Sequence, residues 1–275
     1  MYPIGPAVRR GWAACLTFGS CEGHLGPGEA LAILAAGTAA GAVNAVVGSG
    51  SLITFPTLLA FGFPPVVANV SNNVGLVPGN LSSGFGYRRE LAGQRGRLLR
   101  LGVAAGAGAL AGAVALLSLP ASAFRLIVPV LILVACALVL AQPRLSAWIS
   151  ARRGDEPQRA SLALSAGIFL SGAYGGYFGA AQGVLVIGLL GTFLDETLQR
   201  VNGAKNVLVT AVNATAAVVF IGFAHVSWVA VALIAAGSTI GGLLGARFGR
   251  RLPPAALRLF VVVIGVISAI KLLFF

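Results

Sequence analysis

Residues 41–65 read GAVNAVVGSGSLITFPTLLAFGFPP, an uncharged stretch in which a short apolar segment is bounded by glycine and proline. The stretch lies within residues 30–87, a run without any charged side chain, and two further such runs cover residues 160–194 and 206–246. A membrane-spanning helix needs about 20 apolar residues, so each run is long enough for more than one crossing. Hydrophobic residues make up 57% of the chain and charged residues 9%. The sequence therefore predicts an all-α polytopic membrane protein, which excludes a soluble enzyme or a DNA-binding module as the body of the chain.

The basic residues are concentrated in short connections between the apolar runs. The formal net charge is +12, which in a soluble protein would point to nucleic acid. Fifteen of the 19 Lys and Arg residues lie within residues 88–100, 144–159, 200–205 and 247–258. Cations beside apolar spans are the usual mark of the cytoplasmic side. We interpret them as topology signals and expect a lipid bilayer, and not a nucleic acid, as the partner of this surface.

The second half of the chain repeats the first at an offset of 133 residues. The matched pairs include Leu119 with Leu252, Pro120 with Pro253, Arg125 with Arg258, Asn73 with Asn206, Asn80 with Asn213 and, after a two-residue gap, Gly48 with Gly179. This agreement predicts a duplicated unit. We expect an N-terminal leader over residues 1–29, a first membrane repeat over 30–145, a cytoplasmic linker over 146–160 and a second membrane repeat over 161–275.

Each repeat divides into about five apolar segments, and the second segment is short in both. The expected segments are residues 30–48, 51–63, 66–87, 98–118 and 123–141 in the first repeat, and 161–179, 183–194, 203–223, 228–246 and 256–275 in the second. A helix of 12 residues covers about 18 Å, whereas the hydrocarbon core of a bilayer is roughly 30 Å thick. The short segments are therefore predicted to be broken or re-entrant helices that pack inside the protein.

Equivalent loops of the two repeats differ in charge. The connection after the third segment is rich in arginine in the first repeat, over residues 88–100, but has no Lys or Arg around His225 in the second. The connection after the fourth segment shows the reverse. Five crossings per repeat would place equivalent loops on opposite sides of the membrane, so we predict inverted-topology repeats. Such repeats with interrupted helices are typical of secondary transporters, whose substrate lies near the midplane at the repeat interface.

Polar side chains gather beside the short segments of both repeats. A single Ser or Asn in a span often serves only to bond a neighbouring helix, but recurrence of the cluster in both halves favours a substrate site. The candidate substrate-binding residues are Asn44, Gly48, Ser49, Gly50, Ser51, Asn69, Ser71, Asn72, Asn73, Gly179, Gln182, Asn202, Lys205 and Asn206.

The chemistry of these candidates favours a small anion over a metal ion or an amine. No Asp or Glu lies within an expected span, whereas Lys205 brings a cation into the cluster. Backbone N–H groups at a helix start attract anions, and the glycine-rich turns at residues 48–51 and 179–183 would present such groups. We expect no catalytic residue, no metal and no cofactor.

Residues 41–65, followed by Asn69 and by Ser71-Asn72-Asn73, resemble the first-half signature of the sulfite exporter TauE/SafE family of membrane transporters. The sequences GGYFG at residues 175–179 and NGAKN at residues 202–206 resemble its repeat. The resemblance covers nearly the whole chain beyond residue 30. It implies transport of a small sulfur-containing anion, such as sulfite, sulfoacetate or thiosulfate, across the bacterial inner (plasma) membrane, with the site at the matching Gly, Ser and Asn positions.

The sequence departs from the family pattern at one place, and two other classes of protein are alternatives to a transporter. The second half reads GAAQG at residues 179–183 and is poorer in glycine and serine than the first half, which leaves room for an asymmetric site and a substrate unlike sulfite. An intramembrane enzyme is disfavoured because the chain has no HExxH or GxSxG motif and only two histidines, His24 and His225. A non-transport accessory or assembly subunit stays an alternative, and a homo-oligomer is possible.

Overall fold

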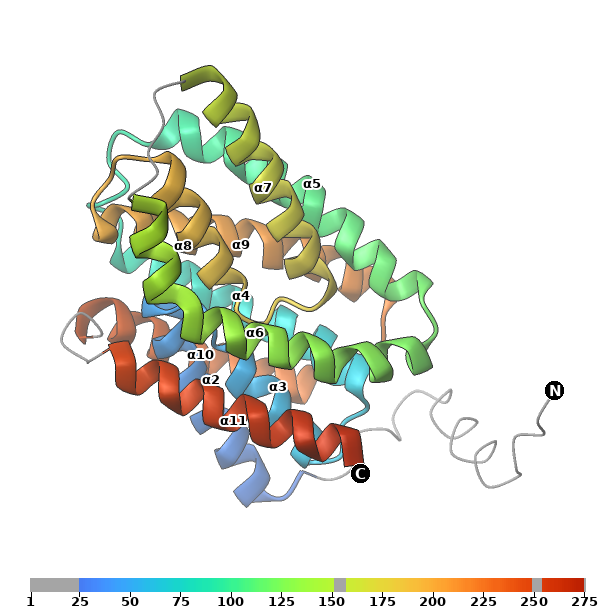
Figure 1. The fold of residues 1–275 in the computed structure, drawn as a ribbon. Coiled ribbons are helices and arrows are strands. Elements are labelled where there is room, and N and C mark those ends of the chain that lie inside the picture. Colours follow the sequence, from blue (N-terminus) through green and yellow to red (C-terminus); the bar gives the residue numbers. More distant parts are fainter. Residues whose placement is uncertain (1–24, 151–156, 249–253, 275) are drawn as a thin grey trace.

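A computed structural model describes residues 25–150, 157–248 and 254–274. Residues 1–24, which hold most of the predicted leader, and residues 151–156 of the predicted linker lie outside the described residues. Within the described ranges all regular secondary structure is helical (Figure 1), which confirms the predicted all-α class.

The described helices follow the predicted apolar segments closely, with the same order of long and short elements in each half. The first half contains α2 (Pro27–Val46), α3 (Ser51–Ala60), α4 (Pro65–Gly86), α5 (Arg95–Ser118) and α6 (Ala121–Ser150). The second half contains α7 (Pro157–Tyr177), α8 (Gln182–Phe193), α9 (Leu198–Phe223), α10 (Trp228–Phe248) and α11 (Pro254–Phe274). The second helix of each half is short, with 10 residues in α3 and 12 in α8, which confirms the predicted short broken helices.

Glycine turns the chain between the first and second helices of each half. Gly48, between α2 and α3, has a φ of +83°, and Gly179, between α7 and α8, has a φ of +78°. These positive values lie in the left-handed region, which glycine enters without the steric penalty of a Cβ atom. The two residues paired by the sequence repeat therefore make the same kind of break.

The fourth helix of each half packs against the other half of the chain. Helix α10 packs on α2 and α4, and α5 packs on α7 and α9, and Figure 1 shows α5 and α7 side by side. The helix backbones touch directly, because a Cβ at Gly41 would lie 2.2 Å from the carbonyl oxygen of Ser238 and one at Gly112 would lie 1.9 Å from that of Ala173. Small residues allow this close approach in membrane helices.

This exchange of helices builds two groups, which we call the first bundle (α2, α3, α4 and α10) and the second bundle (α7, α8, α9 and α5). Helices α4 and α9 pack against each other where the bundles meet, while α6 and α11 pack together and contact α8 and α3 respectively. These contacts correspond to one another when the two halves are interchanged, as a duplication requires. The inverted orientation of the repeats in the bilayer stays a prediction.

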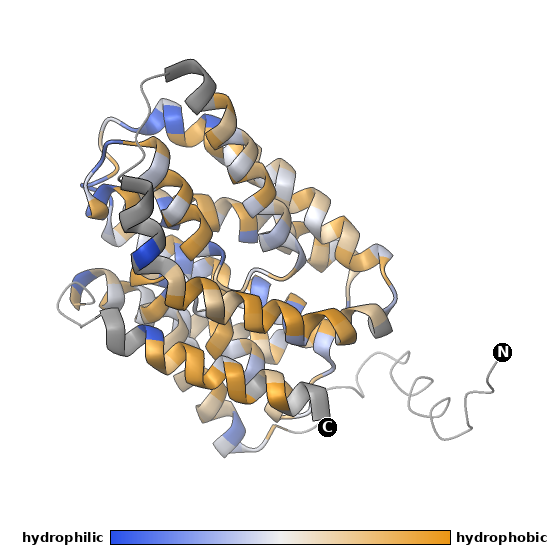
Figure 2. Ribbon diagram, in the orientation of Figure 1, coloured by the Kyte–Doolittle hydropathy of each residue, from blue (hydrophilic) through white to orange (hydrophobic). Residues whose placement is uncertain are grey.

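The outer faces of the helices are apolar. Figure 2 shows hydrophobic colour along α6 and α11 and hydrophilic colour in the connections near the start of α5. Among the exposed side chains are Val103, 73% exposed, and Phe223, 83% exposed, an arrangement that suits contact with lipid rather than water. Within the described part of the chain, α2, α5, α9 and α10 are each long and apolar enough to cross a membrane. The protein is a multi-pass membrane protein.

Candidate functional site

The breaks of the two halves meet in the interior of the protein. The backbone N–H of Gly183, in the first turn of α8, donates to the carbonyl oxygen of Gly48 at 3.1 Å. A Cβ added at either glycine would lie 2.5 Å from the Cα of the other, which is closer than any side chain tolerates. The starts of α3 and α8 therefore converge on this contact, which we call the glycine junction. Gly183 was not among the candidates predicted from the sequence.

Asn44 fixes the geometry on the first-bundle side of the glycine junction. Its Nδ2 donates to Oδ1 of Asn80 at 2.9 Å, and its Oδ1 accepts the N–H of Gly50 at 2.9 Å. The hydroxyl of Thr54 in α3 donates to Oδ1 of Asn72 in α4. These buried bonds hold the end of α2, the start of α3 and the middle of α4 together. Asn44 and Asn72 thus both have structural partners.

Lys205 brings a positive charge from α9 to the same place. The side chain is fully buried, and its Nζ donates to the carbonyl oxygens of Asn44 at 2.6 Å and Ala45 at 3.1 Å. These carbonyls belong to the last turn of α2, where backbone oxygens lack helical partners and carry the negative end of the helix dipole. The second bundle therefore supplies a hydrogen-bond donor to the last turn of α2.

Asn69 makes a hydrogen bond in the reverse sense, from the first bundle to the second. Its Nδ2 donates to the carbonyl oxygen of Tyr177, the last residue of α7, at 3.0 Å. Ser71, in contrast, accepts the N–H of Ser227 at 2.9 Å in the turn between α9 and α10. Both residues thus bond to the second half of the chain, Asn69 to the end of α7 and Ser71 to the turn before α10.

Several predicted residues carry buried polar atoms without a partner among the described residues. These atoms are Oγ of Ser49, Oδ1 of Asn73, Nε2 and Oε1 of Gln182, Oδ1 of Asn202 and Nδ2 of Asn206. Leaving a buried donor or acceptor unsatisfied costs about 1–3 kcal/mol. A polar ligand that entered this region would recover part of that cost, so these atoms have the chemistry of a binding site.

Gln182 stands out because both atoms of its amide lack a partner among the described residues while its exposure is only 2%. It begins α8 directly beside Gly183 of the glycine junction. A Cβ at Gly175 would lie 2.4 Å from Oε1 of Gln182, so glycine at position 175 makes room for the amide. Gly175 belongs to the GGYFG sequence but was not predicted as a site residue.

Some of the backbone N–H groups at the starts of α3 and α8 already donate hydrogen bonds within the protein. The N–H of Gly50 is bonded to Asn44 and the N–H of Gly183 to Gly48. Ser51 begins α3 and is partly exposed. The positive ends of the α3 and α8 dipoles also lie at these helix starts. The described residues contain no group of three or more His, Cys, Asp or Glu that could hold a metal ion.

An ion-pair cluster lies outside the spans at the arginine-rich end of the second bundle. Glu196, in the turn between α8 and α9, accepts from Arg97 at 2.6 Å and from Arg200 at 2.5 Å. Arg200 also donates to the carbonyl oxygen of Ala92 at 3.3 Å. The hydrogen bond from Arg97, and then those of Arg200, hold the pKa of the Glu196 carboxyl below its usual range. The cluster ties the α4–α5 connection to the α8–α9 turn.

The fold and this buried polar centre define a class: a polytopic helical membrane protein with unpartnered polar atoms buried between two interlocked bundles. Comparison with known proteins gives the family. The family described as sulfite exporter TauE/SafE matches residues 33–272. The chain belongs to the sulfite exporter TauE/SafE family and is a membrane transporter.

Relatives agree with this assignment over nearly their full length. A probable membrane transporter protein of Haemophilus influenzae is 27% identical over 251 residues, covering 90% of this chain and 95% of the relative. The probable membrane transporter protein YfcA of Escherichia coli K12 is 23% identical and covers 86% of both chains. A probable membrane transporter protein of Sinorhizobium, ORF9, is 25% identical and covers 85% of this chain and 88% of the relative. No solved structure shows significant similarity to the chain.

Proposed function

We propose that the protein is a secondary transporter that moves a small sulfur oxyanion or organosulfonate across the bacterial cytoplasmic membrane. Sulfite, sulfoacetate and thiosulfate define the substrate class. The proposal includes the two membrane repeats over residues 30–145 and 161–275, joined by a cytoplasmic linker and inverted relative to each other. It assigns no catalytic step to the protein.

The observation that carries the proposal is the glycine junction with its surroundings. The amine of Lys205 is fully buried there and donates to the α2 carbonyls, and the amide of Gln182 has no hydrogen-bond partner among the described residues. A cation together with unpartnered amides and hydroxyls suits an anion that accepts several hydrogen bonds. The positive ends of the α3 and α8 dipoles add to this attraction, as in other transporters with interrupted helices.

The contacts between the bundles support alternating access as the mechanism. The bonds from Lys205 to α2 and from Asn69 to Tyr177 join one bundle to the other. Rocking of the bundles about the α4–α9 contact would exchange these bonds and open the centre to one side of the membrane at a time. The substrate would then contact Lys205 in place of the α2 carbonyls during part of the cycle.

Flux into proteoliposomes tests the proposal directly. The purified chain is reconstituted, and uptake of sulfite, thiosulfate and sulfoacetate is compared with that of empty vesicles. We expect flux of at least one of these anions, and its loss in Gln182→Leu. Thr192→Val is the matched control, because Thr192 lies in the same helix but its hydroxyl donates to the carbonyl of Gly188 at 2.7 Å. Absence of flux for all three anions with a folded protein would favour an accessory subunit instead.

A further inference from the structure

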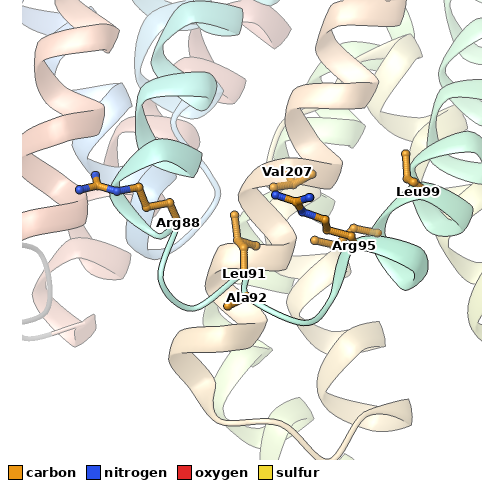
Figure 3. A pocket seen from close by; sticks show the side chains of 7 residues that line it. Arg88, Leu91, Ala92, Arg95, Leu99 and Val207 are labelled. Carbon is orange, nitrogen blue, oxygen red and sulfur yellow. The ribbon is translucent and has the colours of Figure 1, made fainter.

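A groove opens at the arginine-rich end of the protein, away from the glycine junction. It has a volume of about 520 Å³. Figure 3 shows the side chains around it, which come from the α4–α5 connection, the start of α5 and α9. The lining residues are Arg88, Leu91, Ala92, Arg95, Leu98, Leu99 and Val207. Two arginines and five apolar residues give the groove an amphipathic lining.

The groove continues from the loop region into the membrane-spanning part of α9. Val207 lies nine residues beyond Leu198, where α9 begins, and a helix rises about 1.5 Å per residue, so Val207 is roughly 14 Å along the helix. Figure 3 shows the Arg95 side chain reaching back toward Val207, with Leu91 and Ala92 below it. A ligand in the groove would therefore meet a charged group beside an apolar wall.

The surroundings of the groove face lipid. Leu99 is 71% exposed and belongs to the apolar outer face of α5, together with Val103. On the α4 side, the guanidinium of Arg88 lies 4.5 Å from the ring centroid of Phe85, which is itself 62% exposed. The contact is a cation–π interaction, and arginines beside apolar spans are typical of the cytoplasmic membrane surface. A basic and apolar lining beside exposed apolar side chains suits a phospholipid, which joins a phosphate to acyl chains.

The local charge favours an anionic partner, because residues 88–100 contain five arginines and one acidic residue, Glu90. The carboxylate of Glu196 already accepts hydrogen bonds from Arg97 and Arg200, and both arginines that line the groove are exposed. The chain as a whole has 19 basic residues against seven acidic ones. Basic pockets between membrane helices on the cytoplasmic side bind anionic lipid headgroups.

We propose that this groove binds one anionic phospholipid. Arg95 contacts the phosphate, Arg88 adds attraction at the rim, and an acyl chain lies against Leu98, Leu99 and Val207. The ligand class is a phosphodiester with an apolar tail, so both parts of the lining are needed. This site is separate from the proposed transport site and does not depend on the proposed function.

Native mass spectrometry of the full chain in detergent tests the proposal with phosphatidylglycerol and phosphatidylcholine as probes. We expect preferential retention of phosphatidylglycerol. Arg95→Gln should weaken that binding about fivefold, since one basic residue near a lipid surface contributes about 1 kcal/mol, and Arg88→Gln should weaken it less. Arg100→Gln is the matched control, because Arg100 is an exposed arginine of α5 that does not line the groove.

A variant of the apolar wall tests whether the acyl chain contributes to binding, and a soluble competitor tests whether a phosphate ester alone can bind. Leu99→Asn should lower retention of both lipids, because it acts on the acyl chain rather than on the headgroup. Glycerol 3-phosphate should not compete. Equal losses in Arg95→Gln and Arg100→Gln would indicate diffuse attraction and overturn the proposal, as would equal retention of the two lipids or displacement by glycerol 3-phosphate. If Arg95→Gln does not fold, the comparison of Arg88→Gln with Arg100→Gln decides.

Discussion

The Nζ atom of Lys205 lies 2.6 Å from the carbonyl oxygen of Asn44, and this bond joins the third helix of one half to the end of the first helix of the other. The repeat pairs Lys205 with Asn72, which instead accepts a hydrogen bond from Thr54 of its own half. The two halves therefore use equivalent positions differently. The two halves have corresponding helices, but only the second half contributes a lysine to the centre. The centre is therefore asymmetric.

Replacing this lysine should affect transport and stability together. Lys205→Met removes the charge and leaves the carbonyls of Asn44 and Ala45 without their donor. We expect anion affinity to fall roughly thirtyfold if about 2 kcal/mol of charge-assisted binding is lost, and the unfolding temperature to fall as well. Lys205→Arg keeps the charge and should retain part of both. Flux in proteoliposomes and thermal unfolding measure the two effects, and unchanged flux in Lys205→Met would remove the lysine from the site.

Alanine substitutions at Gly48 and Gly62 should distinguish the cost of a left-handed backbone from the cost of a steric clash at the glycine junction. Gly48 and Gly62 share a φ of +83°, but a Cβ at Gly48 would lie 2.5 Å from the Cα of Gly183, whereas one at Gly62 meets nothing within 4 Å. Gly62→Ala should cost about 1–2 kcal/mol from the left-handed backbone alone. Gly48→Ala should cost clearly more, because the helix starts must also move apart. Thermal unfolding of the two variants checks this, and equal shifts would contradict the contact.

The ion-pair cluster predicts a pH dependence of stability. The pKa of Glu196 is lowered in the folded protein, chiefly by the hydrogen bond from Arg97 and also by Arg200. Its stabilising effect is therefore present above the unfolded pKa and is lost as the pH falls through the lowered folded pKa. We expect Glu196→Gln to lose about 0.5–1 kcal/mol at neutral pH, as for partly exposed ion pairs.

Unfolding temperatures of the wild type and Glu196→Gln, measured from neutral pH downward, test this dependence. The difference between them should shrink as the carboxyl of the wild type becomes protonated, because both proteins then carry a neutral side chain at this position. A difference that is constant with pH would show that the charge of Glu196 does not contribute.

The inverted arrangement of the repeats can be tested by labelling. Arg89 and His225 are both exposed and lie in equivalent connections, after α4 and after α9. In a background without the native cysteines, Arg89→Cys should react with a membrane-impermeant maleimide only from the cytoplasmic side, and His225→Cys only from outside. Reaction of both from the same side would exclude the inverted topology.

The sequence was sufficient to predict the helices because hydropathy, glycine and proline act locally. The break at Gly48 and the short α3 follow from residues adjacent in the chain, and the repeat offset identified the partner of Gly48 in the second half. The exchange of α5 and α10 could not be predicted, because a row of glycines shows that a close neighbour exists but not which helix it is.

The site was predictable as a set of residue types and not as a set of bonds. Asn69 and Lys205 both bond to backbone carbonyls of the opposite half, and a carbonyl has no sequence signature. Gly175 and Gly183 were missed for a related reason: their importance comes from the atoms that approach them, Gln182 and Gly48. The spatial approach of the two breaks was needed to find them.

The packing of α10 on α2 and α4 also constrains the order in which the protein can be made. Helices α2 and α4 are synthesised first, yet the helix that covers them begins at Trp228, more than 140 residues after α4 ends at Gly86. Until α10 has been inserted, the glycine face around Gly41 has no backbone to pack against. We therefore expect that neither half folds by itself, and that halves expressed as separate chains are degraded singly but assemble when produced together.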